Sequence, residues 1–141
     1  MDELLPRLAE LKTLEVRVVL VANGPVEALP AFVRQHALEG RGVTMVTDPS
    51  LQSFRAAGLL RPRLHGLRAA VDALRALGAG YAPGRPAGDV LQLGGAVVLD
   101  EALRVVYYHR GRSPGDLADS NDIVQAALAL LVERRLAGRR V

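Results

Sequence analysis

The pattern of apolar and polar residues along the chain predicts four β-strands. Residues 16–22 and 43–47 form two nearly continuous apolar runs rich in β-branched side chains, which is typical of parallel strands covered on both faces. Two further apolar runs, 96–99 and 104–109, flank a polar turn at 100–102 and predict a hairpin. The sheet is therefore expected to mix parallel and antiparallel strands.

Helices are predicted around these strands, where apolar residues recur at the spacings of three and four typical of a helix with one buried face. Pro30 is expected to begin the second helix; Asp48 is expected to cap the third, with Pro49 at its first position. The predicted helices cover residues 2–14, 30–38, a short segment ending near Gly58, 65–77 and 123–136. The order α-β-α-β-α-α-β-β-α predicts a single α/β domain over residues 1–141.

The composition gives little support for a nucleic-acid or membrane partner. The net charge of the 141 residues is only +3, and aromatic residues make up 4% of the chain. A nucleic-acid surface would interleave clustered cations with aromatic side chains, and the best candidate is the short stretch YYHRGR at 107–112. No apolar run approaches the roughly 18 residues of a membrane span, and the first residues do not resemble a signal peptide. We therefore expect a cytoplasmic protein that binds neither nucleic acid nor membrane.

The chain contains no cysteine. As given, it therefore has no disulfide, no thiolate zinc site and no thiol mechanism. The three histidines, His36, His65 and His109, lie far apart in different predicted elements, so we predict no metal site. No cofactor is expected either, because the G-x-G at 78–80 follows a predicted helix and not a strand, which makes it a poor dinucleotide signal.

A cluster of polar residues after the hairpin allows one further enzymatic hypothesis. His109, Asp116, Asp119 and Asp122 together carry groups suited to a metal-dependent or acid–base reaction. The aspartates also have a simpler explanation, because aspartate favours turns and helix caps. They directly precede the apolar helix predicted over 123–136.

Two glycines, Gly94 and Gly95, precede the hairpin, although glycine weakens a strand. One explanation is a β-bulge. The other is a close approach of another group to the backbone. The residues alone leave both explanations open.

The order and spacing of these segments resemble the thioredoxin fold in its peroxiredoxin-like form, the alkyl hydroperoxide reductase/thiol-specific antioxidant (AhpC/TSA) family. The resemblance is carried by VVLVANGPVEALPAFVRQHAL at 18–38, VTMVTDPSLQSFRAAGLL at 43–60 and GDVLQLGGAVVLDEALRVVYYHR at 88–110. The QLGG at 92–95 is similar to the branch related to selenoprotein redoxins. The resemblance implies a mixed sheet flanked by helices and an origin in a thiol-dependent antioxidant oxidoreductase.

The same resemblance implies a site that has lost its thiols. In thioredoxin-like proteins a cis-proline precedes the hairpin and faces a C-x-x-C motif, and Gly94 falls at the place of that proline. Pro6 matches the proline of the family's first helix, which puts Met1 at the place of the second cysteine. The resemblance therefore implies a vestigial site at Gln92, Gly94 and Gly95, with no catalytic residue.

The family's first cysteine, with the strand that leads to it, would lie before Met1. Two explanations are open: a longer natural protein carries the motif and the start is internal, or the chain is a natural fragment that has lost it. Genomic sequence upstream of Met1 would decide between them. As given, we expect an inactive relative of a thiol-dependent antioxidant oxidoreductase; the alternative is a non-catalytic protein-binding module of thioredoxin fold.

In the family the missing strand is central, between the strands that resemble 16–21 and 96–99 here. Both of these segments are apolar, and an exposed apolar edge recruits partners. One outcome is a closed sheet in the order 43–47, 16–21, 96–99, 104–109. The other is self-association, as a homodimer or by strand exchange, which we expect.

Overall fold

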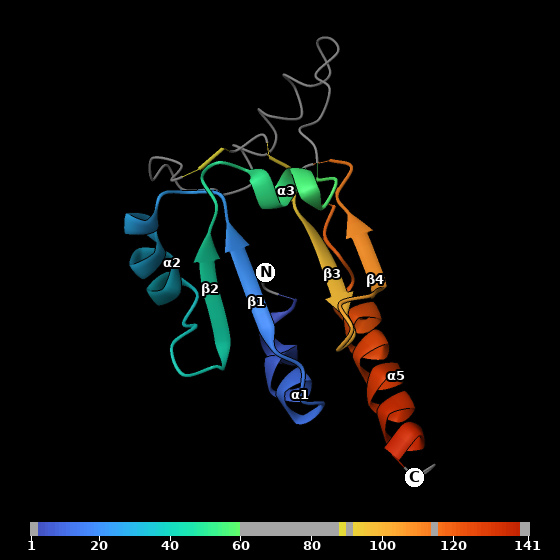
Figure 1. The fold of residues 1–141 in the computed structure, drawn as a ribbon. Coiled ribbons are helices and arrows are strands. Elements are labelled where there is room, and N and C mark those ends of the chain that lie inside the picture. The colour runs from blue at the N-terminus through green and yellow to red at the C-terminus, as the bar shows by residue number, and fades with distance from the viewer. Residues whose placement is uncertain (1–2, 60–87, 90–91, 114–115, 139–141) are drawn as a thin grey trace.

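The strands and helices follow the predicted order along the part of the chain that the structure describes. This computed structural model describes residues 3–59, 88–89, 92–113 and 116–138 (Figure 1). The strands are β1 (Val18–Ala22), β2 (Val43–Thr47), β3 (Gly95–Leu99) and β4 (Val105–Arg110), and the helices are α1 (Leu8–Thr13), α2 (Leu29–Gln35), α3 (Gln52–Ala56) and α5 (Ser120–Gly138). Short 3-10 helices, Leu5–Arg7 and Val26–Ala28, precede α1 and α2. The helix predicted over 65–77 lies outside the described residues.

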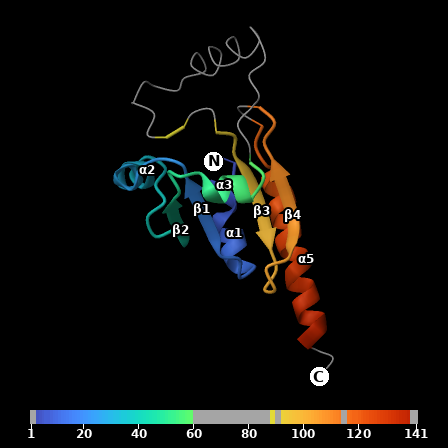
Figure 2. The same ribbon diagram turned by 45° about the horizontal axis from the view of Figure 1, so that its top comes forward.

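These strands form two separate two-stranded sheets. β1 and β2 pair in parallel, and β3 and β4 pair antiparallel. Figures 1 and 2 show β1 and β3 as the inner strands, facing each other without a strand between them. The closed four-stranded sheet is therefore wrong: both of its outer pairings form, but the pairing of β1 with β3 does not.

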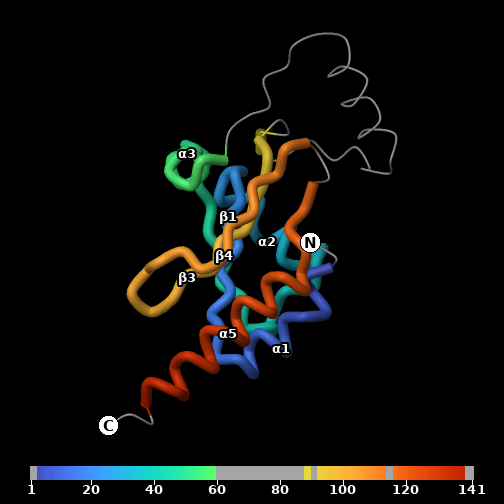
Figure 3. The backbone as a smooth tube through the Cα atoms, turned by 90° about the vertical axis from the view of Figure 1, so that its right-hand side faces the viewer, coloured from blue at the N-terminus to red at the C-terminus, as the bar shows by residue number. Residues whose placement is uncertain are grey.

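Helices packed behind the strands connect the two sheets. Leu11 of α1 forms a buried cluster with Val124 and Ala127 of α5, and Val18 of β1 packs against it. Figure 3 shows α1 and α5 on the same side of the strands. Because β1 packs on this cluster and β3 and β4 contact α5, the helix pair holds the two sheets in one fold.

In the part of the chain that the structure describes, the opposite face of both sheets carries exposed apolar side chains. Burial alternates along β1 and β2, so that every second side chain points away from the helices. Val19 of β1 is 47% exposed and Val97 of β3 is 41% exposed. The exposed apolar side chains of the four strands are Val19, Val21, Val46, Val97, Leu99, Val105, Val106 and Tyr108.

The outer half of α5 extends past the strands (Figures 1 and 3). It exposes the apolar side chains of Leu128, Val132 and Leu136. Arg134 in this half forms ion pairs of 2.9 Å with Glu15 and 2.9 Å with Glu101. None of the helices that the structure describes is long and apolar enough to cross a membrane.

The start of α3 differs from the predicted cap. Pro49 lies before the helix, which begins at Gln52 after Leu51 in a left-handed conformation (φ 59°). The Asp48 carboxylate still binds the first turn, because it accepts a hydrogen bond from the Ser53 N–H at 2.6 Å. The prediction is therefore wrong about the first helical residue and right that Asp48 binds the helix start.

Asp48 also joins the ends of the parallel pair, because its N–H donates to the Ala22 carbonyl at 2.8 Å. The hydroxyl of Ser50 donates to one carboxylate oxygen, and Ser53 donates to the other through both its hydroxyl and its N–H. These hydrogen bonds, that from Ser50 most, lower the pKa of Asp48 from 3.8 to about 2.

We expect the purified chain to self-associate through its inner strands, because unprotected apolar edges recruit partners. Light scattering over a concentration series should give a mass that rises above the 15.1 kDa of one chain. Val97→Lys places a charge on an inner strand and should return the mass toward 15.1 kDa. Thr44→Lys, on β2, is the matched control and should not. A constant monomer mass would contradict the expectation.

Ser50→Ala should raise the pKa of Asp48 from about 2 toward 3.8, because it removes the largest cause of the depression. The hydrogen bonds to Asp48 favour the ionised form, so their stabilisation is fully present above pH 3.8 and is lost as pH falls through about 2. NMR titration of the carboxyl carbons measures the shift. Asp100, whose lowered pKa depends first on the Arg104 N–H, is the internal control. An unchanged Asp48 midpoint would refute this assignment.

Candidate functional site

The residues predicted to form a vestigial site lie where β3 begins and β4 ends. Gly95 pairs with Arg110, and the Gly111 N–H donates to the Gly94 carbonyl at 3.0 Å. The hairpin therefore brings Gln92, Gly94 and Gly95 beside the basic stretch 107–112. The sequence alone did not indicate that these two groups of residues lie side by side.

Gly95, and not Gly94, is the glycine that close packing requires. A β-carbon at Gly95 would lie 2.5 Å from the His109 carbonyl oxygen and 2.5 Å from Cδ2 of Leu59, whereas one at Gly94 would meet nothing within 4 Å. The groups that approach the backbone of Gly95 are therefore the His109 carbonyl and the side chain of Leu59, which comes from the segment that follows α3.

The alternative explanation, a β-bulge at the glycines, is wrong. Pairing is regular from Gly95 to Val98, and the register shifts between Val98 and Leu99. The irregularity therefore lies at the turn end of the hairpin, where Leu103 has a positive φ of 62°.

Gln92 holds the chain that leads into β3. Its side-chain Nε2 donates to the Leu59 carbonyl at 2.8 Å and to the Leu93 carbonyl at 2.9 Å. Its amide N–H groups are thus used by the fold. Met1 lies outside the described residues, so the expected proximity of the chain start to Gly94 stays a prediction.

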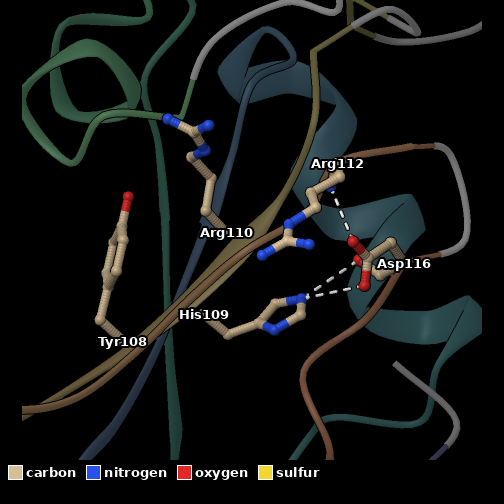
Figure 4. Close-up of a pocket in the computed structure, with 5 residues that line it drawn as sticks. All are labelled: Tyr108, His109, Arg110, Arg112 and Asp116. Carbon is tan, nitrogen blue, oxygen red and sulfur yellow. Dashed lines mark hydrogen bonds and ion pairs between the residues drawn. The ribbon is translucent and has the colours of Figure 1, made fainter.

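A pocket of about 410 Å³ opens beside these residues, lined by Tyr108, His109, Arg110, Arg112 and Asp116 (Figure 4). His109 Nε2 lies 3.4 Å from both Oδ1 and the carbonyl oxygen of Asp116. The Arg112 N–H donates to the other Asp116 carboxylate oxygen at 2.8 Å. Asp116 therefore bonds back to the residue Arg112, shortly after β4. The sequence had grouped Asp116 with His109, and the structure brings the two side chains together.

The pocket can attract an anion but offers no evident nucleophile. Within the described part of the chain, the guanidinium groups of Arg110 and Arg112 make no hydrogen bond or ion pair, which leaves both able to bind an oxyanion. The Tyr108 hydroxyl donates to the Ala57 carbonyl at 2.6 Å, and none of the lining residues that the structure describes is a cysteine, serine or threonine. The two guanidinium groups make anion binding the role that this geometry supports.

The other two aspartates belong to the start of α5. The Asp119 carboxylate accepts the Asn121 N–H at 2.7 Å, and its carbonyl accepts the Ile123 N–H at 3.2 Å. Asp122 lies in the first helical turn. Burial raises the pKa of Tyr107, and the charges of Asp122 and Asp119 add to this effect. The simpler explanation as a helix cap therefore holds for Asp119.

The histidines do not converge. His36 ends α2 and its ring centroid lies 4.4 Å from that of Phe32, while His109 lies in the pocket and His65 lies outside the described residues. Across residues 3–59, 88–89, 92–113 and 116–138, no group of three or more His, Asp or Glu side chains could hold a metal ion.

Sequence reasoning missed the contribution of the segment after α3. Leu59 packs on Gly95 and accepts from Gln92, and Ala57 accepts from Tyr108, which is 51 positions away in the chain. No local pattern marks such contacts, because each depends on how the hairpin lies against α3.

Comparison with known proteins gives one match. A family model described as "AhpC/TSA antioxidant enzyme" matches residues 3–113, which include both sheets and the glycines of the vestigial site. No curated protein and no solved structure matches the chain.

Gly95→Ala should destabilise the fold by about 1–3 kcal/mol, the usual cost of overpacking, because the new methyl group would overlap Leu59 and the His109 carbonyl. Gly94→Ala is the matched control and should change the free energy of unfolding by less than about 1 kcal/mol, because its position is open. Urea unfolding measures both. Equal losses would disprove the distinction.

Proposed function

The chain belongs to the AhpC/TSA antioxidant enzyme family, and from this premise we propose that it carries out no thiol peroxidase or disulfide reductase reaction itself. The observation that carries the proposal is the absence of cysteine from all 141 residues. In the family's chemistry a cysteine of low pKa at the first helix attacks peroxide or a disulfide. A chain without a thiol cannot form that thiolate.

The remaining groups offer no substitute for it. The only sulfur atoms belong to two methionines, Met1 and Met45, and a thioether is oxidised to a sulfoxide without forming the mixed disulfide that a thiol cycle needs. In the pocket the Tyr108 hydroxyl is bound to the Ala57 carbonyl. These facts support a non-catalytic role.

Descent from a thiol-dependent antioxidant oxidoreductase is part of the proposal. It is supported by the family match over residues 3–113 and by the glycine pair that begins β3. In the resemblance Gly94 falls where the family has its cis-proline, and a β-carbon at Gly94 would meet nothing within 4 Å. These observations support the proposed descent.

A second candidate function, a protein-binding module of thioredoxin fold, is favoured by a different observation. Among the described strands, β1 and β3 each pair on one edge alone, and their outward side chains are apolar and exposed. Such surfaces mark interaction sites. The two candidates are compatible, because a domain without thiol chemistry retains its surfaces.

The purified chain, supplied with hydrogen peroxide and dithiothreitol, should consume peroxide no faster than buffer with dithiothreitol. A cysteine-containing AhpC/TSA relative, assayed in parallel, shows that the conditions support the reaction. Thiol-dependent consumption that is proportional to protein concentration and persists through repurification would refute the proposal.

A further inference from the structure

The pocket at the end of β4 is lined by two arginines whose guanidinium groups the fold does not use. Arg110 is the last residue of β4, and Arg112 follows it shortly after the strand. Neither guanidinium group forms a hydrogen bond or an ion pair with another residue that the structure describes. At the other end of the same hairpin, by contrast, Arg104 pairs with Asp100 at 2.6 Å. The two forked donors of the pocket are therefore available to a ligand.

The backbone after β4 places Arg112 beside Arg110. The Arg112 N–H donates to the Asp116 carboxylate at 2.8 Å. A β-carbon at Gly111 would lie 2.9 Å from the Asp116 carbonyl oxygen, so a side chain at this position would force the two segments apart. Figure 4 shows the guanidinium group of Arg112 between the side chains of Arg110 and His109. Backbone contacts thus set the position of Arg112, and its side chain is left to bind a ligand.

Asp116 is the one acidic residue among the lining residues that the structure describes, and its carboxylate is directed to other groups. Oδ1 lies 3.4 Å from His109 Nε2, and Oδ2 accepts the Arg112 N–H. Neither oxygen forms an ion pair with a guanidinium group. Two positive charges therefore face the pocket against one negative charge, and the pocket favours an anion.

The arrangement of donors favours a phosphate group over a carboxylate. A single guanidinium group matches a carboxylate, whose two oxygens accept two parallel N–H groups. Two guanidinium groups that enter the pocket from different positions suit an anion with three terminal oxygens and a charge of about −1.5 to −2, which describes a phosphate monoester near pH 7. The pocket volume of about 410 Å³ lies within the range of roughly 300–1,000 Å³ of small-molecule sites. A small phosphate monoester therefore fits both the charge and the size.

An exposed apolar surface adjoins the arginines and indicates which group the phosphate carries. Tyr108 lines the pocket, and its hydroxyl donates to the Ala57 carbonyl at 2.6 Å, which fixes the ring. Val97 is the partner of Tyr108 in the β3–β4 register, so the two side chains lie on the same face of the hairpin. Both side chains are exposed. An aromatic ring attached to the phosphate would stack on Tyr108 and cover Val97.

We propose that this pocket binds a small phosphate monoester that carries an aromatic group. The phosphate binds the guanidinium groups of Arg110 and Arg112, and the aromatic group packs on Tyr108 and Val97. This binding goes beyond the proposed thiol-free function and uses none of the groups of a thiol reaction.

The first test titrates phenyl phosphate into the purified chain by calorimetry at low ionic strength, where charges are weakly screened. Binding should saturate at one site per chain. Arg110→Gln and Arg112→Gln should each weaken it about tenfold or more, because each removes charge-assisted hydrogen bonds. Arg17→Gln is the matched control, since it removes the same charge from an exposed arginine before β1, and should change the affinity by less than about twofold.

Asp116→Asn tests the charge balance of the pocket. The variant removes the negative charge, and its amide oxygen can still accept the Arg112 N–H. Phenyl phosphate should therefore bind about threefold more tightly. Weaker binding to the folded variant would contradict the proposed charge balance.

Two variants of Tyr108 test the aromatic part of the ligand. The unchanged chain should bind phenyl phosphate more tightly than inorganic phosphate. Tyr108→Phe keeps the ring and should keep this preference, whereas Tyr108→Ala removes the ring and should abolish the preference. A preference that persists in Tyr108→Ala would refute the stacking.

Circular dichroism establishes that each variant is folded, and NMR of the unchanged chain gives a measurement that needs no variant. On addition of phenyl phosphate, the largest shifts should fall on the Nε–H groups of Arg110 and Arg112. Shifts elsewhere, an absence of saturable binding, or equal losses in Arg17→Gln and Arg112→Gln would overturn the inference. Tighter binding of benzoate, or of a single-stranded oligonucleotide without a terminal phosphate, would also overturn it, because the pocket would then select a carboxylate or a nucleic acid.

Discussion

The packing of α1 against α5 is the interaction on which the rest of this structure depends. Leu11 of α1 is buried against Val124 and Ala127 of α5. β1 packs on this cluster, and the β3–β4 hairpin contacts α5. The helix pair therefore connects the two sheets, which do not pair with each other directly, and the hairpin's open end is held beside α3 by Leu59 and Gln92.

The strands could be predicted from the sequence because their signals are local. The run 43–47 matches β2 at both ends, and the other strands begin or end within two residues of the predicted positions. The start of α3 was mispredicted because Asp48 bonds with Ser50 and Ser53 before the helix, so that Pro49 lies in the turn. The closed sheet was also wrong, because the apolar pattern of a strand does not determine which strands pair with each other.

At the candidate site, too, the local features could be predicted from the sequence and the long-range contacts could not. The alignment drew attention to Gly94, whereas the tight packing is at Gly95, because the Leu59 side chain that fills the space comes from the end of a separate segment. The proximity of His109 to Asp116 followed from their closeness in sequence, and the cap at Asp119 from its position before an apolar helix. The pairing of the basic stretch with the glycines required the antiparallel register, which places Arg110 opposite Gly95.

The open edges and the missing thiol concern the same part of the fold. In the family resemblance, the strand between β1 and β3 leads directly to the cysteine motif that faces the residue before the hairpin. In that resemblance Gly94 holds the place of this residue, and a β-carbon at Gly94 would meet nothing within 4 Å. The pocket lined by Arg110 and Arg112 lies at this end of the hairpin, because Arg110 pairs with Gly95.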